Sequence, residues 1–242
     1  MGLQMIIFTA DTDWAADYIL DFFFNEVEKY KSPWIIFATN KYERFQNLKK
    51  KGYEIGIHPN FIPCINRSEM NAEVERLKMI FPEATYSRSH SLLSGGPIWD
   101  ALEQNGITHD FTLFNPYSES TRKRILWNGL IQVEFNWEDD FHFHIKEINA
   151  DHSDRLIKQK DLILNFHPIH FFLNTKSKND YNEYLSAREN KQKISDLQKR
   201  NWESGFGCGN LLLNLLQNKP PIPHSSLVDE IEKLQYMDYL WS

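Results

Sequence analysis

The sequence has few cysteines, no excess of basic residues and no long apolar segment, and each absence excludes a class of protein. Two isolated cysteines, Cys64 and Cys208, form neither a zinc-binding motif nor a disulfide framework. The formal net charge of −6 argues against a nucleic-acid-binding protein. No apolar run approaches the roughly 18 residues of a membrane span, and the N-terminus lacks the regions of a signal peptide. We therefore expect a soluble, cytoplasmic protein that does not insert into a membrane.

The sequence does contain an alternation of short strands and helices. Its 242 residues are 41% hydrophobic and 25% charged, an ordinary globular composition. Short apolar runs predict strands at 5–10, 33–38, 53–57, 85–87, 107–113, 131–135 and 162–166. Apolar residues at helical spacing predict helices at 14–30, 40–50, 68–80 and 97–104. This alternation is typical of βα units around a mostly parallel sheet.

The pattern departs from a regular eightfold barrel in two places. Residues 114–130 read as loop and irregular strand where a crossover helix is expected. Residues 176–200 are charged and predict a solvated helix, and a glycine-rich turn at 205–209 precedes an apolar helix at 211–217. We predict a single domain over 1–242. It consists of an incomplete, distorted parallel (β/α) barrel over about 3–175 and a helical extension over 176–242 packed on it.

Five of the apolar runs end in residues that can carry chemistry. The residues at these ends are Asp11 and Asp13; His58; Arg88 and His90; Glu138, Asp139 and Asp140; and His167 and His170. In an α/β barrel the active site forms at the C-terminal ends of the strands. Acids, imidazoles and a guanidinium gathered there suggest a metal-assisted hydrolase.

Several of the acidic and histidine residues also have a purely structural interpretation. Asp13 can cap a helix while Asp11 is a solvated strand end, and for this pair the two interpretations have equal weight. A single His at a strand end, such as His58, is more often structural than a metal ligand. The alternation Phe-His-Phe-His favours ordinary strand positions for His142 and His144 over positions in a site.

The joint order of these motifs resembles that of the polysaccharide deacetylases, the nodulation-type carbohydrate esterases. That family carries an acidic pair after its first strand, a metal-binding His motif, an Arg motif, an Asp/Trp motif and a late Leu-x-His motif. The matching segments here are 10–14, 56–60, 88–91, 137–140 and 164–167, so the resemblance covers roughly residues 5–172. In detail the chain is similar to a divergent branch of O-antigen and surface-polysaccharide biosynthesis.

The chain departs from the family pattern at its metal ligands. Thr12 splits the usual adjacent acidic pair, and Ile62 stands where the family has a second metal-binding His. His90 occupies a position that is usually Pro, and it can supply the missing imidazole. We therefore expect Asp13, His58 and His90 to bind a divalent metal. Three protein ligands suit Zn²⁺, and oxygen and imidazole ligands also allow Fe²⁺, Co²⁺ or Ni²⁺.

The resemblance also implies catalytic roles. Asp11 would be the general base, oriented by Arg88, and His167 would be the general acid, with His170 as its substitute. One of three adjacent acids would hold the imidazole of His167 and raise its pKa: Glu138, Asp139 or Asp140.

Substrate contacts follow from the same resemblance. Trp14 and Trp137 would form walls for a sugar ring, and Asn60 and Glu138 would be further contacts. The implied reaction removes an N-acetyl group from an amino-sugar or glycan intermediate of surface-polysaccharide biosynthesis.

Two other functions are compatible with the sequence. One is a hydrolase of another small C–N or ester bond. The other is a non-catalytic carbohydrate-binding protein that has lost its metal, which the missing second His favours. Asp11, Arg88 and His167 argue against a pure binding protein, because binding alone needs neither a base nor an acid.

Overall fold

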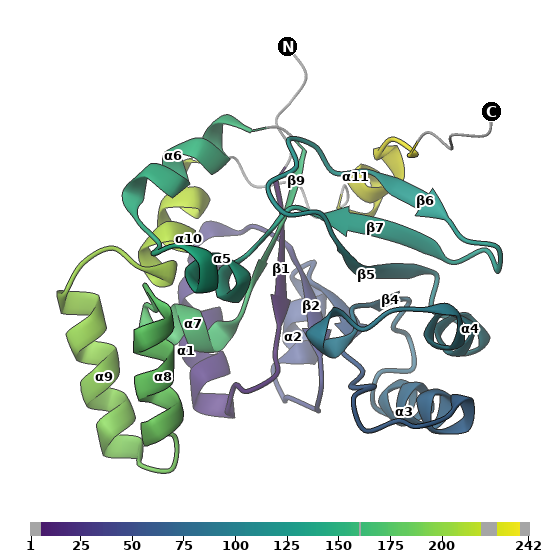
Figure 1. Cartoon of the computed structure of the whole chain (residues 1–242), viewed down its shortest axis with the longest axis horizontal. Coiled ribbons are helices and arrows are strands. Elements are labelled where there is room, and N and C mark those ends of the chain that lie inside the picture. The colour runs from purple at the N-terminus through teal and green to yellow at the C-terminus, as the bar shows by residue number, and fades with distance from the viewer. Residues whose placement is uncertain (1–5, 160, 219–226, 238–242) are drawn as a thin grey trace.

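A curved nine-stranded sheet forms the centre of the molecule, as a computed structural model of the chain shows for residues 6–159, 161–218 and 227–237 (Figure 1). The strands are β1 (Ile6–Asp11), β2 (Trp34–Ala38), β3 (Glu54–Ile57), β4 (Tyr86–Ser87), β5 (His109–Phe114), β6 (Lys123–Ile125), β7 (Ile131–Phe135), β8 (Trp137–Glu138) and β9 (Leu162–Phe166). Their order is β6-β7-β5-β4-β3-β2-β1-β9-β8. All neighbouring pairs are parallel except β6–β7.

Asn136 connects the two ends of this sheet. It is the single residue between β7 and β8, and β8 pairs with β9 at the far side of the strand order. The Asn136 backbone N–H donates to the Ile163 carbonyl, and its side-chain oxygen accepts from the Ile163 N–H, both at 2.9 Å. The parallel sheet thus curls into an incomplete, distorted barrel, which confirms the predicted fold class.

Strand alternation divides the core into an outer and an inner part. Ile6, Phe8 and Ala10 of β1 pack in the large cluster shared with the helices, whereas Ile7 belongs to a cluster inside the barrel. Because successive strand residues point to opposite faces, Thr9 and Asp11 share the inner face with Ile7. The interior is therefore apolar near the strand starts and polar near their C-terminal ends.

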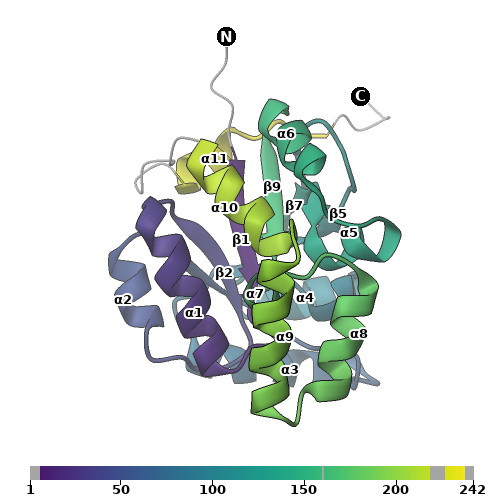
Figure 2. The same ribbon diagram turned by 90° about the vertical axis from the view of Figure 1, so that its left-hand side faces the viewer.

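Helices cover the outside of the barrel (Figures 1 and 2). Those that follow the early strands are α1 (Asp17–Val27), α2 (Phe45–Lys50), α3 (Arg67–Ile80) and α4 (Gly96–Gln104). Those beside β8 and β9 are α5 (Asp139–Ile145), α6 (Ala150–Lys158) and α7 (Pro168–Leu173). Residues 114–130 contain β6 and loops instead of a crossover helix, as the sequence predicts. Among the described residues, no helix has the length and apolar character needed to cross a bilayer.

Two expectations about helices need correction. The charged segment expected to be one helix over 176–200 forms two, α8 (Lys178–Ala187) and α9 (Lys191–Glu203). The Phe-His-Phe-His segment lies in α5 rather than in a strand. Its buried residues are Asp139, His142 and Phe143, and this i, i+3, i+4 spacing is helical despite the local alternation.

The last two described helices differ in position: the first packs on the outside of the barrel, and the second closes the end opposite the strand C-termini. Helix α10 (Cys208–Asn218) packs on α6 and α7 (Figure 2). Helix α11 (Leu227–Lys233) places Leu227 and Ile231 in the inner apolar cluster, beside Phe111 and Val133. Lys123 is almost fully buried and donates from Nζ to the Glu232 carbonyl at 2.7 Å, which ties the end of α11 to β6.

Candidate active site

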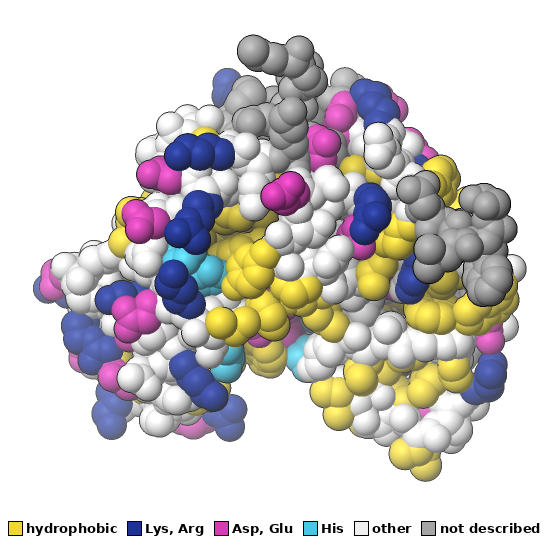
Figure 3. Space-filling model, turned by 45° about the horizontal axis from the view of Figure 1, so that its top comes forward, with side chains coloured by type: hydrophobic (Ala, Val, Ile, Leu, Met, Phe, Trp, Pro, Cys, Tyr) yellow, Lys and Arg dark blue, Asp and Glu magenta, His cyan; other side chains and the backbone are white. Residues whose placement is uncertain are grey.

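A pocket of about 300 Å³ lies at the C-terminal ends of the parallel strands. Its walls are Asp11, Asp13, Trp14, His58, Ser89, His90, Ser91, Leu92, Glu138, Asp140, Phe141, His144 and His167. Figure 3 shows a hollow at the lower edge of the molecule in that view, with histidine side chains (cyan) beside it. A larger and more open depression of about 710 Å³ lies between α8 and α9, but it contains no histidine and no buried carboxylate.

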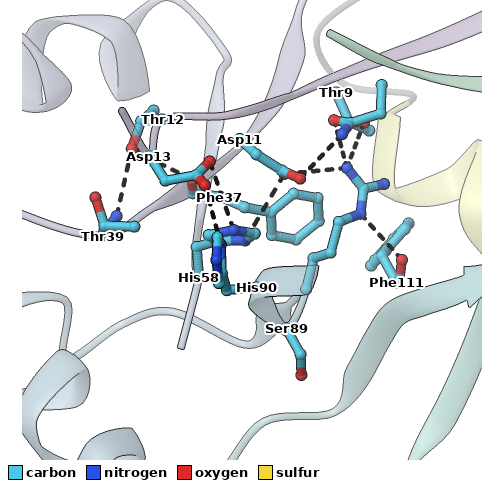
Figure 4. Close-up of polar contacts among 12 residues, drawn as sticks. Thr9, Asp11, Thr12, Asp13, Phe37, Thr39, His58, Ser89, His90 and Phe111 are labelled. Carbon is cyan, nitrogen blue, oxygen red and sulfur yellow. Dashed lines mark hydrogen bonds and ion pairs between the residues drawn. The ribbon is translucent and has the colours of Figure 1, made fainter. Parts of the chain in front are cut away.

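Asp13, His58 and His90 meet at one side of the pocket (Figure 4). Their candidate ligand atoms all lie within 4.8 Å of one another. Asp13 Oδ2 is 3.0 Å from His90 Nδ1, and Asp13 Oδ1 is 3.6 Å from His58 Nε2. Both carboxylate oxygens of Asp13 and both ring nitrogens of His58 are buried without a hydrogen-bond partner among the described residues.

The protonation states of Asp13 and His58 suit a bound cation. Burial would raise the pKa of Asp13, but the neighbouring His90, His58 and His167 outweigh it and hold that pKa well below its usual value. Burial lowers the pKa of His58, so this imidazole is neutral at neutral pH and can bind metal. Unpaired buried polar atoms cost free energy, and a divalent ion would satisfy the carboxylate of Asp13 and one ring nitrogen of His58. One carboxylate and two imidazoles form a suitable donor set.

Asp11 is held by a buried polar network below the pocket. Arg88 is fully buried and donates from Nη1 to Asp11 Oδ1 at 3.1 Å, to Thr9 Oγ1 at 2.9 Å and to Asn165 Oδ1 at 2.5 Å (Figure 4). Asn165 Nδ2 in turn donates to Asp11 Oδ2 at 2.9 Å. The guanidinium also lies over the rings of Phe37 and Phe135. Arg88 thus contacts Asp11 through a buried ion pair.

His167 faces Asp11 across the pocket and is fixed by Asp139. Its Nδ1 lies 2.7 Å from Asp139 Oδ1, and its backbone N–H donates to Asp139 Oδ2 at 2.8 Å. Its Nε2 lies 3.9 Å from Asp11 Oδ2. Of the three adjacent acids, Asp139 is therefore the one that holds the imidazole. Burial would lower the pKa of His167, but Asp139 and then Asp140 outweigh it, so this pKa is well above its usual value.

Trp14 and an acidic segment form opposing walls of the pocket. Trp14 is about half exposed and adopts a left-handed backbone with φ of 61°. Its ring stacks on His167 at a centroid distance of 5.4 Å and meets His90 edge-on at 5.5 Å. Glu138 and Asp140 line the other wall. Burial, and then the nearby Asp140, raise the pKa of Glu138 well above its usual value.

Three residues expected at the site lie elsewhere. Trp137 is buried in the outer core, where its Nε1 donates to His142 Nδ1, so it is not a wall of the pocket. Asn60 lies on a separate surface depression and its Oδ1 accepts from the Ile62 N–H. His170 is fully buried against Phe143 and does not line the pocket, because helix α7 turns it away from the strand end.

Two residues of the network, Thr9 and Asn165, were not predicted from the sequence. Both are polar residues inside otherwise apolar strands rather than at strand ends. The signal that could identify them is alternation, because Thr9 lies two residues before Asp11 and therefore shares its face. Asn165 pairs with Thr9 across the β1–β9 register.

Comparisons with known proteins show the family and the fold. A family model described as WbmS-like polysaccharide deacetylase matches residues 8–185. The chain is also similar to a solved structure from Bordetella bronchiseptica, described as a candidate polysaccharide deacetylase involved in O-antigen biosynthesis (WbmS). That match has 25% identity and a TM-score of 0.73, and it covers 89% of this chain and 91% of the other.

More distant structures share the fold alone. A candidate polysaccharide deacetylase from Mycobacterium smegmatis is 12% identical with a TM-score of 0.51, and the match covers 100% of this chain and 98% of the other. A family 4 carbohydrate esterase from Streptomyces lividans, solved with acetate, is 8% identical with a TM-score of 0.50, covering 90% and 91%. No protein with a curated functional description matches the sequence.

Proposed function

Because this chain belongs to the WbmS-like polysaccharide deacetylases, we propose that it is a metal-dependent hydrolase of an N-acetyl group. Its substrate would be an amino sugar or glycan intermediate of surface-polysaccharide biosynthesis. The observation that carries the proposal is one pocket that combines a candidate metal site with a paired base and acid. Asp13, His58 and His90 stand on one side, and Asp11 and His167 lie 3.9 Å apart beside them.

Asp13, His58 and His90 would hold the metal, and their unpartnered buried atoms support this assignment. A divalent ion bound there would polarise the amide carbonyl and lower the pKa of a water molecule. The donor set suits Zn²⁺ and also accommodates Fe²⁺, Co²⁺ or Ni²⁺.

Asp11 would take the proton of the attacking water. Hydrogen bonds from Arg88 and Asn165 fix both of its oxygens, so its position is set before substrate arrives. Such preorganisation matters because a proton acceptor must lie within hydrogen-bond reach of the proton that it removes.

His167 would protonate the leaving amine. Its raised pKa keeps a substantial fraction of the imidazole protonated at neutral pH, and Nε2 is the nitrogen that faces the pocket. Asp139 holds the opposite nitrogen and stabilises the imidazolium form. Asp139 itself receives further hydrogen bonds, from the Asp140 N–H at 2.8 Å and the Cys208 thiol at 3.4 Å.

The pocket walls offer contacts to a sugar ring. Trp14 presents an exposed indole face beside His167. The raised pKa of Glu138 favours its protonated form, and that form can donate a hydrogen bond to a hydroxyl or carbonyl oxygen.

A non-catalytic carbohydrate-binding protein is the second candidate function. Ile62 supports it, because this residue stands where the family has a metal-binding His and cannot bind a metal. A binding protein would hold a sugar in the same pocket without using a base or an acid.

The two functions are separated by one set of measurements on purified protein. Metal content is determined by mass spectrometry, and acetate release is assayed on nucleotide-linked and lipid-linked N-acetyl amino sugars. We expect bound metal and metal-dependent acetate release that disappears in Asp11→Asn. Sugar binding without metal and without acetate release would establish the binding protein instead.

A further inference from the structure

His90 lies in an irregular stretch of backbone after a very short strand. It begins a short 3₁₀ turn (His90–Leu92), in which Ser91 and Leu92 both have φ of 54°. The preceding strand β4 has only two residues, and it pairs with β3 at one register position and with β5 at two. By contrast, His58 directly follows β3, and its N–H donates to the Ala38 carbonyl. The backbone before His90 therefore needs hydrogen bonds beyond those between the strands.

A buried threonine supplies one of these hydrogen bonds. The Ser89 N–H donates to Thr112 Oγ1 at 3.0 Å, and both residues are buried. On the other side of Ser89, the His90 N–H donates to the Pro59 carbonyl at 2.9 Å. Thr112 comes from β5, where the register with β7 shifts between Asp110 and Leu113. Such irregularities turn side chains out of the regular strand pattern.

Asp110 fixes the orientation of the Thr112 hydroxyl. The Thr112 hydroxyl donates a short hydrogen bond to Asp110 Oδ1, which also accepts from the Thr112 N–H at 3.1 Å. Gln132 Nε2 donates to Asp110 Oδ2 at 2.8 Å, so the carboxylate is itself held on both sides. A hydroxyl has one proton, and that of Thr112 points to Asp110. A lone pair of Thr112 Oγ1 therefore faces the Ser89 N–H.

Neither Thr112 nor Asp110 lines the pocket or belongs to the candidate metal cluster. A role in the core alone does not need a carboxylate, because burial of an acid is costly unless its partners compensate. The polar chain from Gln132 through Asp110 and Thr112 ends at the peptide next to His90. Its geometric effect is to fix where the His90 imidazole lies relative to Asp13, 3.0 Å away.

We propose that Thr112 and Asp110 are positioning residues for the metal site, acting through the Ser89 peptide on His90. This inference rests on the proposed metal site of Asp13, His58 and His90. It assigns a role to two strand residues that neither the motif pattern nor the pocket lining identifies.

The test compares two substitutions of Thr112 that differ in one hydroxyl. Thr112→Val keeps the side-chain shape and removes the acceptor, whereas Thr112→Ser keeps the acceptor. Metal-free protein is titrated with Co²⁺ and Zn²⁺ in competition with a chromophoric chelator, and the visible spectrum of bound Co²⁺ reports its coordination. We expect affinity about 10–100-fold weaker in Thr112→Val, the usual effect of losing support for a metal ligand. Thr112→Ser should bind as wild type does.

A purely structural role would give another pattern. In that case Thr112→Val would unfold at a lower temperature than wild type, yet bind Co²⁺ with unchanged affinity and spectrum, and the inference would be overturned. If Thr112→Val does not fold, Asp110→Asn replaces it, and unchanged binding there has the same meaning. Failure of the wild-type protein to bind Co²⁺ or Zn²⁺ overturns the metal site itself, which distinguishes the two failures.

Discussion

His58 and His167 are both buried at strand ends, yet their surroundings move their pKa values in opposite directions. Burial dominates at His58 and favours the neutral form that binds metal. At His167 the carboxylates of Asp139 and Asp140 outweigh burial and favour the charged form that can give up a proton. The same residue type thus serves two different purposes because of its neighbours.

The proposed acid can be tested by comparing His167 with its neighbour His170. We expect His167→Ala to lower kcat by about 10²–10⁴-fold with metal content intact, the usual worth of a positioned proton donor. His170→Ala should stay near the wild-type rate, because His170 does not reach the pocket. The pH profile of kcat/KM should lose its basic limb in His167→Ala, and that limb should lie above pH 6.5 in wild type because the pKa is raised. The reverse result would make His170 the acid.

The lowered pKa of buried His142 makes the free energy of unfolding depend on pH. Its Nδ1 accepts from Trp137 Nε1, and burial lowers its pKa from 6.5 to about 4. Between these values the unfolded chain binds more protons than the folded one, so the free energy of unfolding falls as pH falls from 6.5 toward 4. Urea unfolding at pH 5 and 7 should show a smaller fall in His142→Gln than in wild type. The exposed neighbour variant His144→Gln should behave as wild type, and equal falls in all three would contradict the prediction.

The sequence predicted which strand-end residues come together, but not which of several adjacent residues faces the pocket. Asp11, Asp13, His58, His90, Arg88 and His167 all come together as their positions suggest. Among Glu138, Asp139 and Asp140, however, the strand gives way to a helix, and only the structure shows which carboxylate turns toward His167. Trp137 was misplaced for the same reason, because one residue of register decides between pocket and core.

At the scale of elements, strands of the central sheet were predicted well, and helices of the C-terminal half were not. The strands at 131–135 and 162–166 have the expected bounds. Helix α5 was missed because four of its seven residues, 141–144, alternate aromatic and histidine side chains, a pattern that a short strand shares. The break between α8 and α9 falls in a charged stretch where periodicity gives no boundary.

Gly56 in β3 links element packing to the site. A Cβ at this position would lie 2.7 Å from the Tyr86 carbonyl oxygen of β4, closer than real contacts allow. We expect Gly56→Ala to push β4 away and cost about 1–3 kcal/mol of stability, as overpacking does. Since β3 leads to His58 and β4 to His90, metal affinity should fall as well. Gly96→Ala is the matched control, because its Cβ meets only the Trp127 ring at 3.7 Å. Unfolding curves measure the stability of both variants, and metal titration measures their affinity. Wild-type stability and affinity in Gly56→Ala would contradict the prediction.

The whole molecule separates a stabilising end of the barrel from a chemical end. Helix α11 fills the interior opposite the pocket with Leu227 and Ile231, while Arg88 and Asp11 occupy the interior next to the pocket. We expect Ile231→Ala to cost about 2–5 kcal/mol of stability, as for other buried Ile truncations. Activity at low temperature and metal affinity should stay near wild type. Loss of metal binding in folded Ile231→Ala would show that the two ends are coupled.

A metal at the proposed site would join segments that are far apart in the chain. Asp13, His58 and His90 follow β1, β3 and β4, so the site exists only when these strands are assembled. An ion that binds the folded state alone stabilises it by about 4 kcal/mol when its free concentration is roughly 1,000 times Kd. The melting temperature should therefore rise with added Zn²⁺ and fall with a chelator. In Asp13→Ala the melting temperature should no longer respond to Zn²⁺, because a carboxylate ligand is gone. The imidazoles of His58 and His90 remain in that variant, so a full Zn²⁺ response there would place the ion elsewhere. A wild-type protein whose melting temperature does not respond to Zn²⁺ would remove the metal from the mechanism.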